Sequence, residues 1–205
     1  MNNQLPYQVG ITGGIGSGKS LACRVFRILG IPIYEADARA KWLMNHNPEL
    51  KAQLSEAFGE SAYQEDGSLN RRYLAEQVFG DSDQVAKLNS LVHPKVREDG
   101  LAWAKDHADA PYILREIPLL FETGAEKTLD ATITVSAPEE LRIERVKTRD
   151  PQRSEKEVRG ILSKQASEEE RLSKADHVLY NDEKQLLLPQ IIGLHEKLVW
   201  CWATY

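Results

Sequence analysis

A glycine-rich segment near the start of the chain has residue types and a spacing that suit phosphate binding. Residues 13–20 read GGIGSGKS and fit the pattern G-x-x-x-x-G-K-[ST]. Glycines let a backbone wrap a polyphosphate with its N–H groups turned inward, and the N-terminus of a following helix adds partial positive charge. The nucleotide-binding residues predicted from this segment are Gly13, Gly14, Ile15, Gly16, Ser17, Gly18, Lys19, Ser20 and Leu21.

Two side chains of this segment carry specific chemistry. Lys19 is placed to reach the β- and γ-phosphates of a nucleoside triphosphate, and the Ser20 hydroxyl is placed to ligate Mg²⁺. The alternative without a binding function is a tight strand-to-helix turn that contains a lysine by chance. The flanking residues disfavour it, because the apolar run 8–12 precedes the glycines and Leu21, Val25 and Ile28 follow at helical spacing. The pattern leaves open which molecule receives the phosphate.

Further apolar runs predict the sheet that carries this loop. Residues 31–34, 112–117, 131–135 and 177–180 read as strands, separated by helical stretches. Strands that alternate with helices indicate an α/β P-loop NTPase fold, with a five-stranded parallel sheet and helices on both faces.

Two helical segments interrupt this alternation within a single domain, residues 1–205. Residues 38–110 contain no strand-like run and predict a helical insertion. The polar stretch 150–174 follows the Asp150-Pro151 break and predicts a helical lid.

Composition excludes several classes of protein. The 205 residues carry 26 basic and 31 acidic side chains, a net charge of -5, which disfavours a dedicated nucleic-acid binder. Two cysteines do not make a disulfide framework. No apolar stretch approaches membrane-spanning length, and the first ten residues do not read as a signal peptide. We expect a cytoplasmic monomer or weak oligomer with no nucleic-acid or membrane partner.

Motifs in order along the chain resemble those of the dephospho-CoA kinase family, from Val9 to Asp182. Besides the glycine-rich loop they are Glu35-Ala36-Asp37, Leu69-Asn70-Arg71-Arg72-Tyr73-Leu74, His93-Pro94, Ile117-Pro118-Leu119-Leu120-Phe121-Glu122, Arg149-Asp150, Gln165 and Ala175-Asp176. Departures from the family pattern are Leu21 for threonine, Glu35 and Glu116 for aspartate, and Asp182-Glu183 without the glycine that often follows Asn181. None of them removes a group that the chemistry requires.

The resemblance implies a reaction and a helical substrate-binding insertion. ATP would donate its γ-phosphoryl group to the ribose 3′-hydroxyl of dephospho-CoA, giving coenzyme A and ADP, the last step of coenzyme A synthesis. ATP and Mg²⁺ would be the cofactors. Residues 38–110 would hold the acceptor, and residues 150–174 would close over ATP.

Two acids are candidates for the chemistry. The resemblance favours Asp37 as the group that orients the acceptor hydroxyl and takes its proton, and the alternative is an N-cap for a helix starting at Ala38. Glu116 ends a predicted strand, where it could hold Mg²⁺ through water. The alternative for Glu116 is a strand-end charge that meets solvent or Arg115.

Basic residues supply further candidates. Arg142, Arg145 and Arg149 share one helix face, and we expect Arg145 and Arg149 to stabilise the transferring phosphate and Arg142 to lie on the surface. A solvated basic face is the alternative. The predicted acceptor-binding residues are Asp37, Arg71, Arg72, His93, Pro118 and Leu119. The arginine pair could instead be ordinary helix-surface residues, and His93 could mark only a helix boundary before Pro94.

Two other functions remain open from the residues alone. A nucleoside- or nucleotide-monophosphate kinase would share the loop, the sheet and the lid. A P-loop switch or ATP-driven regulator would hydrolyse the nucleotide without a small acceptor, and a GTPase of that kind would carry an Asn-Lys-x-Asp motif, which this sequence lacks.

Overall fold

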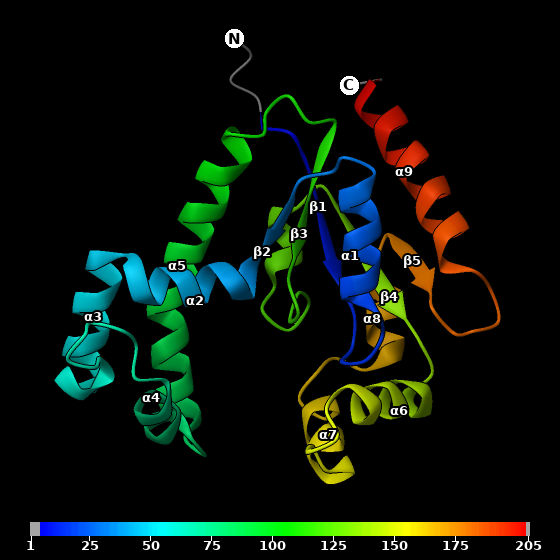
Figure 1. Cartoon of the computed structure of the whole chain (residues 1–205). Helices are drawn as coiled ribbons and strands as arrows, with labels where there is room; N and C mark the ends of the chain where they lie inside the picture. The colour runs from blue at the N-terminus through cyan, green and yellow to red at the C-terminus, as the bar shows by residue number, and fades with distance from the viewer. Residues whose placement is uncertain (1–4, 204–205) are drawn as a thin grey trace. The chain divides into compact units, whose positions relative to one another are not determined.

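A computed structural model describes residues 5–203 of the chain. Within this range five strands form a sheet in the order β2-β3-β1-β4-β5 (Figure 1). The strands are β1 (Tyr7–Thr12), β2 (Ile33–Glu35), β3 (Tyr112–Glu116), β4 (Ala131–Ser136) and β5 (His177–Tyr180). The β1–β3, β1–β4 and β4–β5 pairs are parallel, so the predicted α/β fold with its parallel sheet is confirmed.

The chain divides into two compact units. One consists of residues 1–34 and 104–205 and carries the sheet, and the other consists of residues 35–103. Helices of the first unit are α1 (Lys19–Ile28), α6 (Glu139–Arg149), α7 (Glu155–Leu162), α8 (Glu168–Lys174) and α9 (Leu187–Ala203), with the short 3-10 helix η2 (Ala125–Thr128). Among the residues described, no helix is long and apolar enough to cross a membrane.

The core of the first unit joins the sheet to α1 and α9. Val9, Ile11 and Ile133 of the strands are fully buried, together with Phe26 of α1 and Ile191 of α9. Near-continuous apolar strands are expected in a parallel sheet, because helices cover its faces. The predicted strand runs therefore coincide with the residues that form this core.

The second unit is built from helices. They are α2 (Ala36–His46), α3 (Pro48–Phe58), the 3-10 helix η1 (Glu60–Ala62), α4 (Arg71–Val78) and α5 (Ser82–Lys105), whose last two residues lie in the first unit. Asn47 and Asn70 cap α3 and α4, each accepting a hydrogen bond from a backbone N–H of the first turn. Leu50, Leu54 and Leu74 belong to a separate apolar core. This unit overlaps the predicted insertion 38–110.

Helix α5 continues through Pro94, so the interpretation of His93 as a helix boundary is wrong. Proline removes one backbone hydrogen bond and disfavours helical geometry in the residue before it, which is why the sequence suggests an end there. Packing overrides this local preference: Val92 is buried in the second core, and Val96 packs against that core.

We predict that Leu54→Ala destabilises the protein by about 2–5 kcal/mol, because Leu54 is fully buried and its loss leaves a cavity. The same change at Leu186, which is 78% exposed, should alter the free energy of unfolding by less than about 0.5 kcal/mol. Urea unfolding of the two variants measures the difference. Equal losses would contradict the assignment of Leu54 to the core.

Candidate functional site

The glycine-rich loop connects the carboxyl end of β1 to the N-terminus of α1. Thr12 ends the strand and Lys19 begins the helix, so the predicted strand–loop–helix arrangement is present. Strand β1 lies between β3 and β4, which places the loop beyond the carboxyl edge of the middle of the sheet. Ligands of open α/β sheets bind at this edge.

Two glycines of the loop allow a close approach of other segments. Gly16 has φ +80°, and a Cβ built there would lie 2.3 Å from the backbone oxygen of Arg142 in α6. Gly18 has φ +96°, and its Cβ would lie 2.1 Å from Nδ2 of Asn181. Left-handed backbone therefore favours glycine at both positions, and at Gly16 the backbone of α6 also leaves no space for a side chain.

Hydrogen bonds from distant segments fix the loop from outside. Ile15 N donates to Oε1 of Gln165 at 2.9 Å. Asn181 Nδ2 donates to the Ser17 carbonyl at 2.8 Å, and Arg145 Nη1 donates to the Asn181 carbonyl at 3.0 Å. Within the loop, Ser17 N donates to the Gly14 carbonyl at 3.0 Å. The loop is thus tied to the segment after α7 and to the segment after β5.

Lys19 forms an ion pair with Glu116 at the end of β3. Their side chains are only 13% and 17% exposed, so each charge compensates the other in a largely desolvated position. Glu116 at the end of the strand thus contacts a lysine of the loop, and its role toward Mg²⁺ stays a prediction. Nearby, Thr12 Oγ1 donates to the Pro118 carbonyl at 3.1 Å, and Leu119 is 42% exposed.

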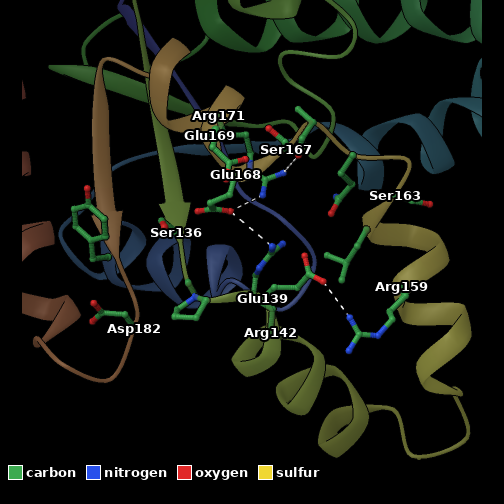
Figure 2. Close-up of a pocket in the computed structure, with 16 residues that line it drawn as sticks. Ser136, Glu139, Arg142, Arg159, Ser163, Ser167, Glu168, Glu169, Arg171 and Asp182 are labelled. Atoms are coloured by element: carbon green, nitrogen blue, oxygen red, sulfur yellow. Dashed lines mark hydrogen bonds and ion pairs between the residues drawn. The ribbon is translucent and has the colours of Figure 1, made fainter.

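The expectation that Arg142 lies on the surface is wrong. Arg142 is 4% exposed, and its Nη1 atom would lie 2.1 Å from a Cβ placed on Gly14. Arg171 of α8 is also buried, and Glu168 lies between the two guanidinium groups, 2.6 Å from Arg171 Nη2 and 3.8 Å from Arg142 Nη2 (Figure 2). The pKa of Arg142 is lowered from its usual value. Burial is the main cause, the charge of Arg171 adds to it, and the charge of Glu168 acts in the opposite direction.

A pocket of about 790 Å³ lies beside this arginine cluster (Figure 2). Its lining comes from the end of β4 and the loop after it, from α6, from the segment that joins α7 to α8, from α8 itself, and from the end of β5 with the residues after it. Arg159 contributes from α7 and forms ion pairs with Glu139 and Glu140 of α6 at 3.1 Å. The pocket is therefore polar and contains charges of both signs.

The other two arginines of the α6 face differ in their surroundings. Arg145 is partly buried and bonds both the Asn181 carbonyl and Oε1 of Glu183, each at 3.0 Å. Arg149 has a 64% exposed side chain, and its nearest acid is Asp150 at 3.9 Å. The structure thus ties Arg145 to the glycine-rich loop through Asn181, whereas Arg149 extends into solvent.

The remaining predicted residues lie in the second unit. Asp37 is exposed and occupies the first turn of α2, and Glu35 is the N-cap residue, so the N-cap interpretation of Asp37 is wrong. Arg71 and Arg72 begin α4, where Arg72 pairs with Glu76 at 2.9 Å. His93 is exposed on α5. These side chains are available for an acceptor.

Within residues 5–203 no group of three or more His, Cys, Asp or Glu side chains is arranged to hold a metal ion. Mg²⁺ needs few protein ligands, because it keeps waters and takes oxygens from bound phosphates. The exposed Ser20 hydroxyl at the start of α1 and the Glu116 carboxylate are oxygen donors of the kind that Mg²⁺ prefers. The donor set fits a metal that arrives with a nucleotide.

Four residues that contact the loop have no functional role predicted from the sequence: Gln165, Asn181, Arg142 and Arg171. Gln165 and Asn181 belong to segments compared with the family, but neither residue type indicates a partner 150 or more positions away. The spacing of Arg142 shows which helix face it shares. It does not show that this face packs on glycines.

Comparison with known proteins gives consistent matches over most of the chain. The sequence model of the family described as dephospho-CoA kinase matches residues 7–186. A dephospho-CoA kinase from Salinibacter ruber is 45% identical over 177 residues, which cover 85% of this chain and 88% of the relative. One from Porphyromonas gingivalis is 37% identical, with 92% of each protein covered.

Solved structures agree with the fold. TT1252 from Thermus thermophilus has a TM-score of 0.78 at 36% identity, covering 96% of this chain and 97% of that chain. A dephospho-CoA kinase from Campylobacter jejuni has a TM-score of 0.64 at 24% identity, covering 95% and 98%. The first match supports both homology and a shared fold, and the second supports the shared fold alone.

We predict that Gly16→Ala weakens binding of MgADP at least about tenfold, because the new Cβ would displace the loop from α6. Gly30→Ala is the matched control, since Gly30 has φ +86° but nothing within 4 Å of the added atom. It should cost about 1–2 kcal/mol of stability and leave binding unchanged. Calorimetric titration measures both, and a normal affinity in Gly16→Ala would contradict the close packing.

Proposed function

The chain belongs to the dephospho-CoA kinase family, and we propose that it transfers the γ-phosphoryl group of ATP to the ribose 3′-hydroxyl of dephospho-CoA. The products are coenzyme A and ADP. The observation that carries this proposal is the family match over residues 7–186, which includes a phosphate loop built at the carboxyl edge of the sheet.

ATP binds in the proposed reaction with its phosphates along residues 13–20. The loop N–H groups, the N-terminus of α1 and the Lys19 ammonium neutralise charge on the β- and γ-phosphates. Ser20 and Glu116 are the residues that would hold Mg²⁺, Glu116 by way of a water molecule. The metal, when bound with ATP, neutralises the charge that develops on the phosphate oxygens.

Asp37 orients the acceptor hydroxyl and accepts its proton. The residue follows the carboxyl end of β2 by two positions, and ligands of α/β sheets bind beyond that end. Its carboxylate is exposed and is not used to cap α2, so it is available for a substrate. A hydroxyl that loses its proton as it attacks phosphorus gains reactivity from such a base.

Arginines complete the proposed site. Arg145 and Arg149 stabilise the transferring phosphate when the segment 150–174 closes over ATP. Arg71 and Arg72 suit an acceptor that carries phosphates, because the guanidinium group binds phosphate oxygens in pairs. His93, Pro118 and Leu119 contact the same acceptor. ATP and dephospho-CoA are the proposed partners of a cytoplasmic monomer or weak oligomer with no nucleic-acid or membrane partner.

A coupled ADP-release assay with MgATP tests the function. Dephospho-CoA, AMP, CMP and no acceptor are compared, and the product is identified by mass and by co-elution with coenzyme A. We expect ADP release that depends on dephospho-CoA. Release with AMP or CMP instead would replace the proposed acceptor with a nucleotide, and release without any acceptor would indicate an ATPase or switch.

We predict that Asp37→Asn lowers kcat at least about 100-fold and leaves the affinity for MgADP unchanged, because the amide cannot accept the proton. Asp83→Asn is the matched control, since Asp83 is likewise an exposed acid in the first turn of a helix. It should retain wild-type turnover. Steady-state kinetics of both variants decide the matter, and retained turnover in Asp37→Asn would remove the base role.

A further inference from the structure

Gln165 reaches the phosphate loop from a segment 150 residues further along the chain. Its Oε1 atom accepts a hydrogen bond from Ile15 N at 2.9 Å. Gln165 lies between α7 and α8, and its side chain is half-buried. The contact is between a side chain and the backbone of the loop, so it acts on the loop's conformation rather than on its charge.

The Ile15 N–H needs such a partner. A backbone donor removed from water costs free energy unless it is paired, and a loop that wraps phosphates does not fold into a helix or strand that would pair it. Gly14 and Gly16 flank Ile15 and add conformational freedom to the backbone on both sides. A fixed acceptor at Ile15 therefore restricts the most adaptable part of the loop.

Gln165 is itself held in place by its neighbour Ala166. The Ala166 N–H donates to Glu122 Oε1 at 2.6 Å, and the Ala166 carbonyl accepts from Arg171 Nη1. Arg171 is almost fully buried and also pairs with Glu168. Both backbone polar groups of the residue next to Gln165 are thus fixed, and the amide oxygen is presented to the loop at little cost in conformational entropy.

The Ile15 side chain makes a second contact with the same part of the protein. It packs against the apolar cluster formed by Ile143 and Val146 of α6 and Val158 of α7. The backbone and the side chain of one loop residue are therefore both held by the region 143–166.

We propose that Gln165 is a positioning residue for phosphate transfer. Its side-chain oxygen fixes the Ile15 peptide. The loop therefore keeps its nucleotide-binding conformation only while the segment between α7 and α8 makes this contact. This deepens the proposed function and rests on it for the role in turnover, whereas the effect on nucleotide binding is independent of the acceptor.

A double-mutant cycle tests the proposal with MgADP as the probe. Gln165→Leu keeps the side-chain volume and removes the acceptor, and Ile15→Pro removes the donor N–H. We expect Gln165→Leu to raise the Kd for MgADP about fivefold to tenfold in the wild-type background. In the Ile15→Pro background the same change should alter the Kd less than about twofold, because no hydrogen bond remains to be lost.

The kinetic readout separates positioning from folding. A smaller folded fraction lowers kcat but changes no Michaelis constant, whereas a displaced loop raises the KM for ATP and leaves the KM for dephospho-CoA unchanged. We expect the second pattern in Gln165→Leu. Thr128→Ala is the control, since it removes a hydrogen bond to the Ala125 carbonyl elsewhere in the same unit and should leave both constants unchanged.

Three results would overturn the proposal. They are a wild-type Kd for MgADP in Gln165→Leu, an equal effect of that change in both backgrounds, and a fall in kcat with both Michaelis constants unchanged. Thermal unfolding of each variant checks that it is folded during the titration. Failure of the proposed function looks different, since the wild type would then bind MgADP but show no turnover that depends on dephospho-CoA.

Discussion

A loop that binds phosphate with its backbone must leave several N–H groups free of internal partners. The Ser17 N–H bonds the Gly14 carbonyl within the loop, but N–H groups kept for phosphate cannot add to such bonds, so contacts from outside must help to fix its shape. In this chain Gln165 and Asn181 supply the external bonds, and Arg142 packs against the glycines. The strand order of the sheet makes these contacts possible, because it brings the segments after β4 and β5 to the end of β1.

The charged side chains near the loop are also held by partners from other segments. Lys19 is paired with Glu116, whereas the buried guanidinium groups of Arg142 and Arg171 share one close carboxylate, that of Glu168. Buried cations without full compensation are costly, and they create a site that favours anions. In the proposed reaction phosphate oxygens approach Lys19, and the Glu116 carboxylate is then available to Mg²⁺ and its waters.

Features that depend on the local pattern of residues can be predicted from the sequence. The apolar runs of the strands and the glycine-rich loop are recognisable because burial in a parallel sheet and phosphate binding each demand a particular composition. The continuation of α5 through Pro94 is missed, since the packing of Val92 and Val96 outweighs the local cost of proline.

The packing around the site is missed for a related reason. Helical spacing puts Arg142 on the same face as Arg145, but it does not reveal that glycines lie against that face. The bond between Gln165 and Ile15 joins residues 150 positions apart, and neither residue type carries a signal for the other. Side-chain positions of this kind follow from the tertiary fold.

In the proposed reaction the externally held loop presents ATP to a ribose hydroxyl activated by Asp37. A crystal structure with MgADP and dephospho-CoA is the direct test of this arrangement. We expect the β-phosphate within the loop beside Lys19, and the acceptor 3′-oxygen about 2.6–3.2 Å from the Asp37 carboxylate. An acceptor bound with its 3′-oxygen away from Asp37, or a nucleotide bound outside residues 13–20, would contradict it.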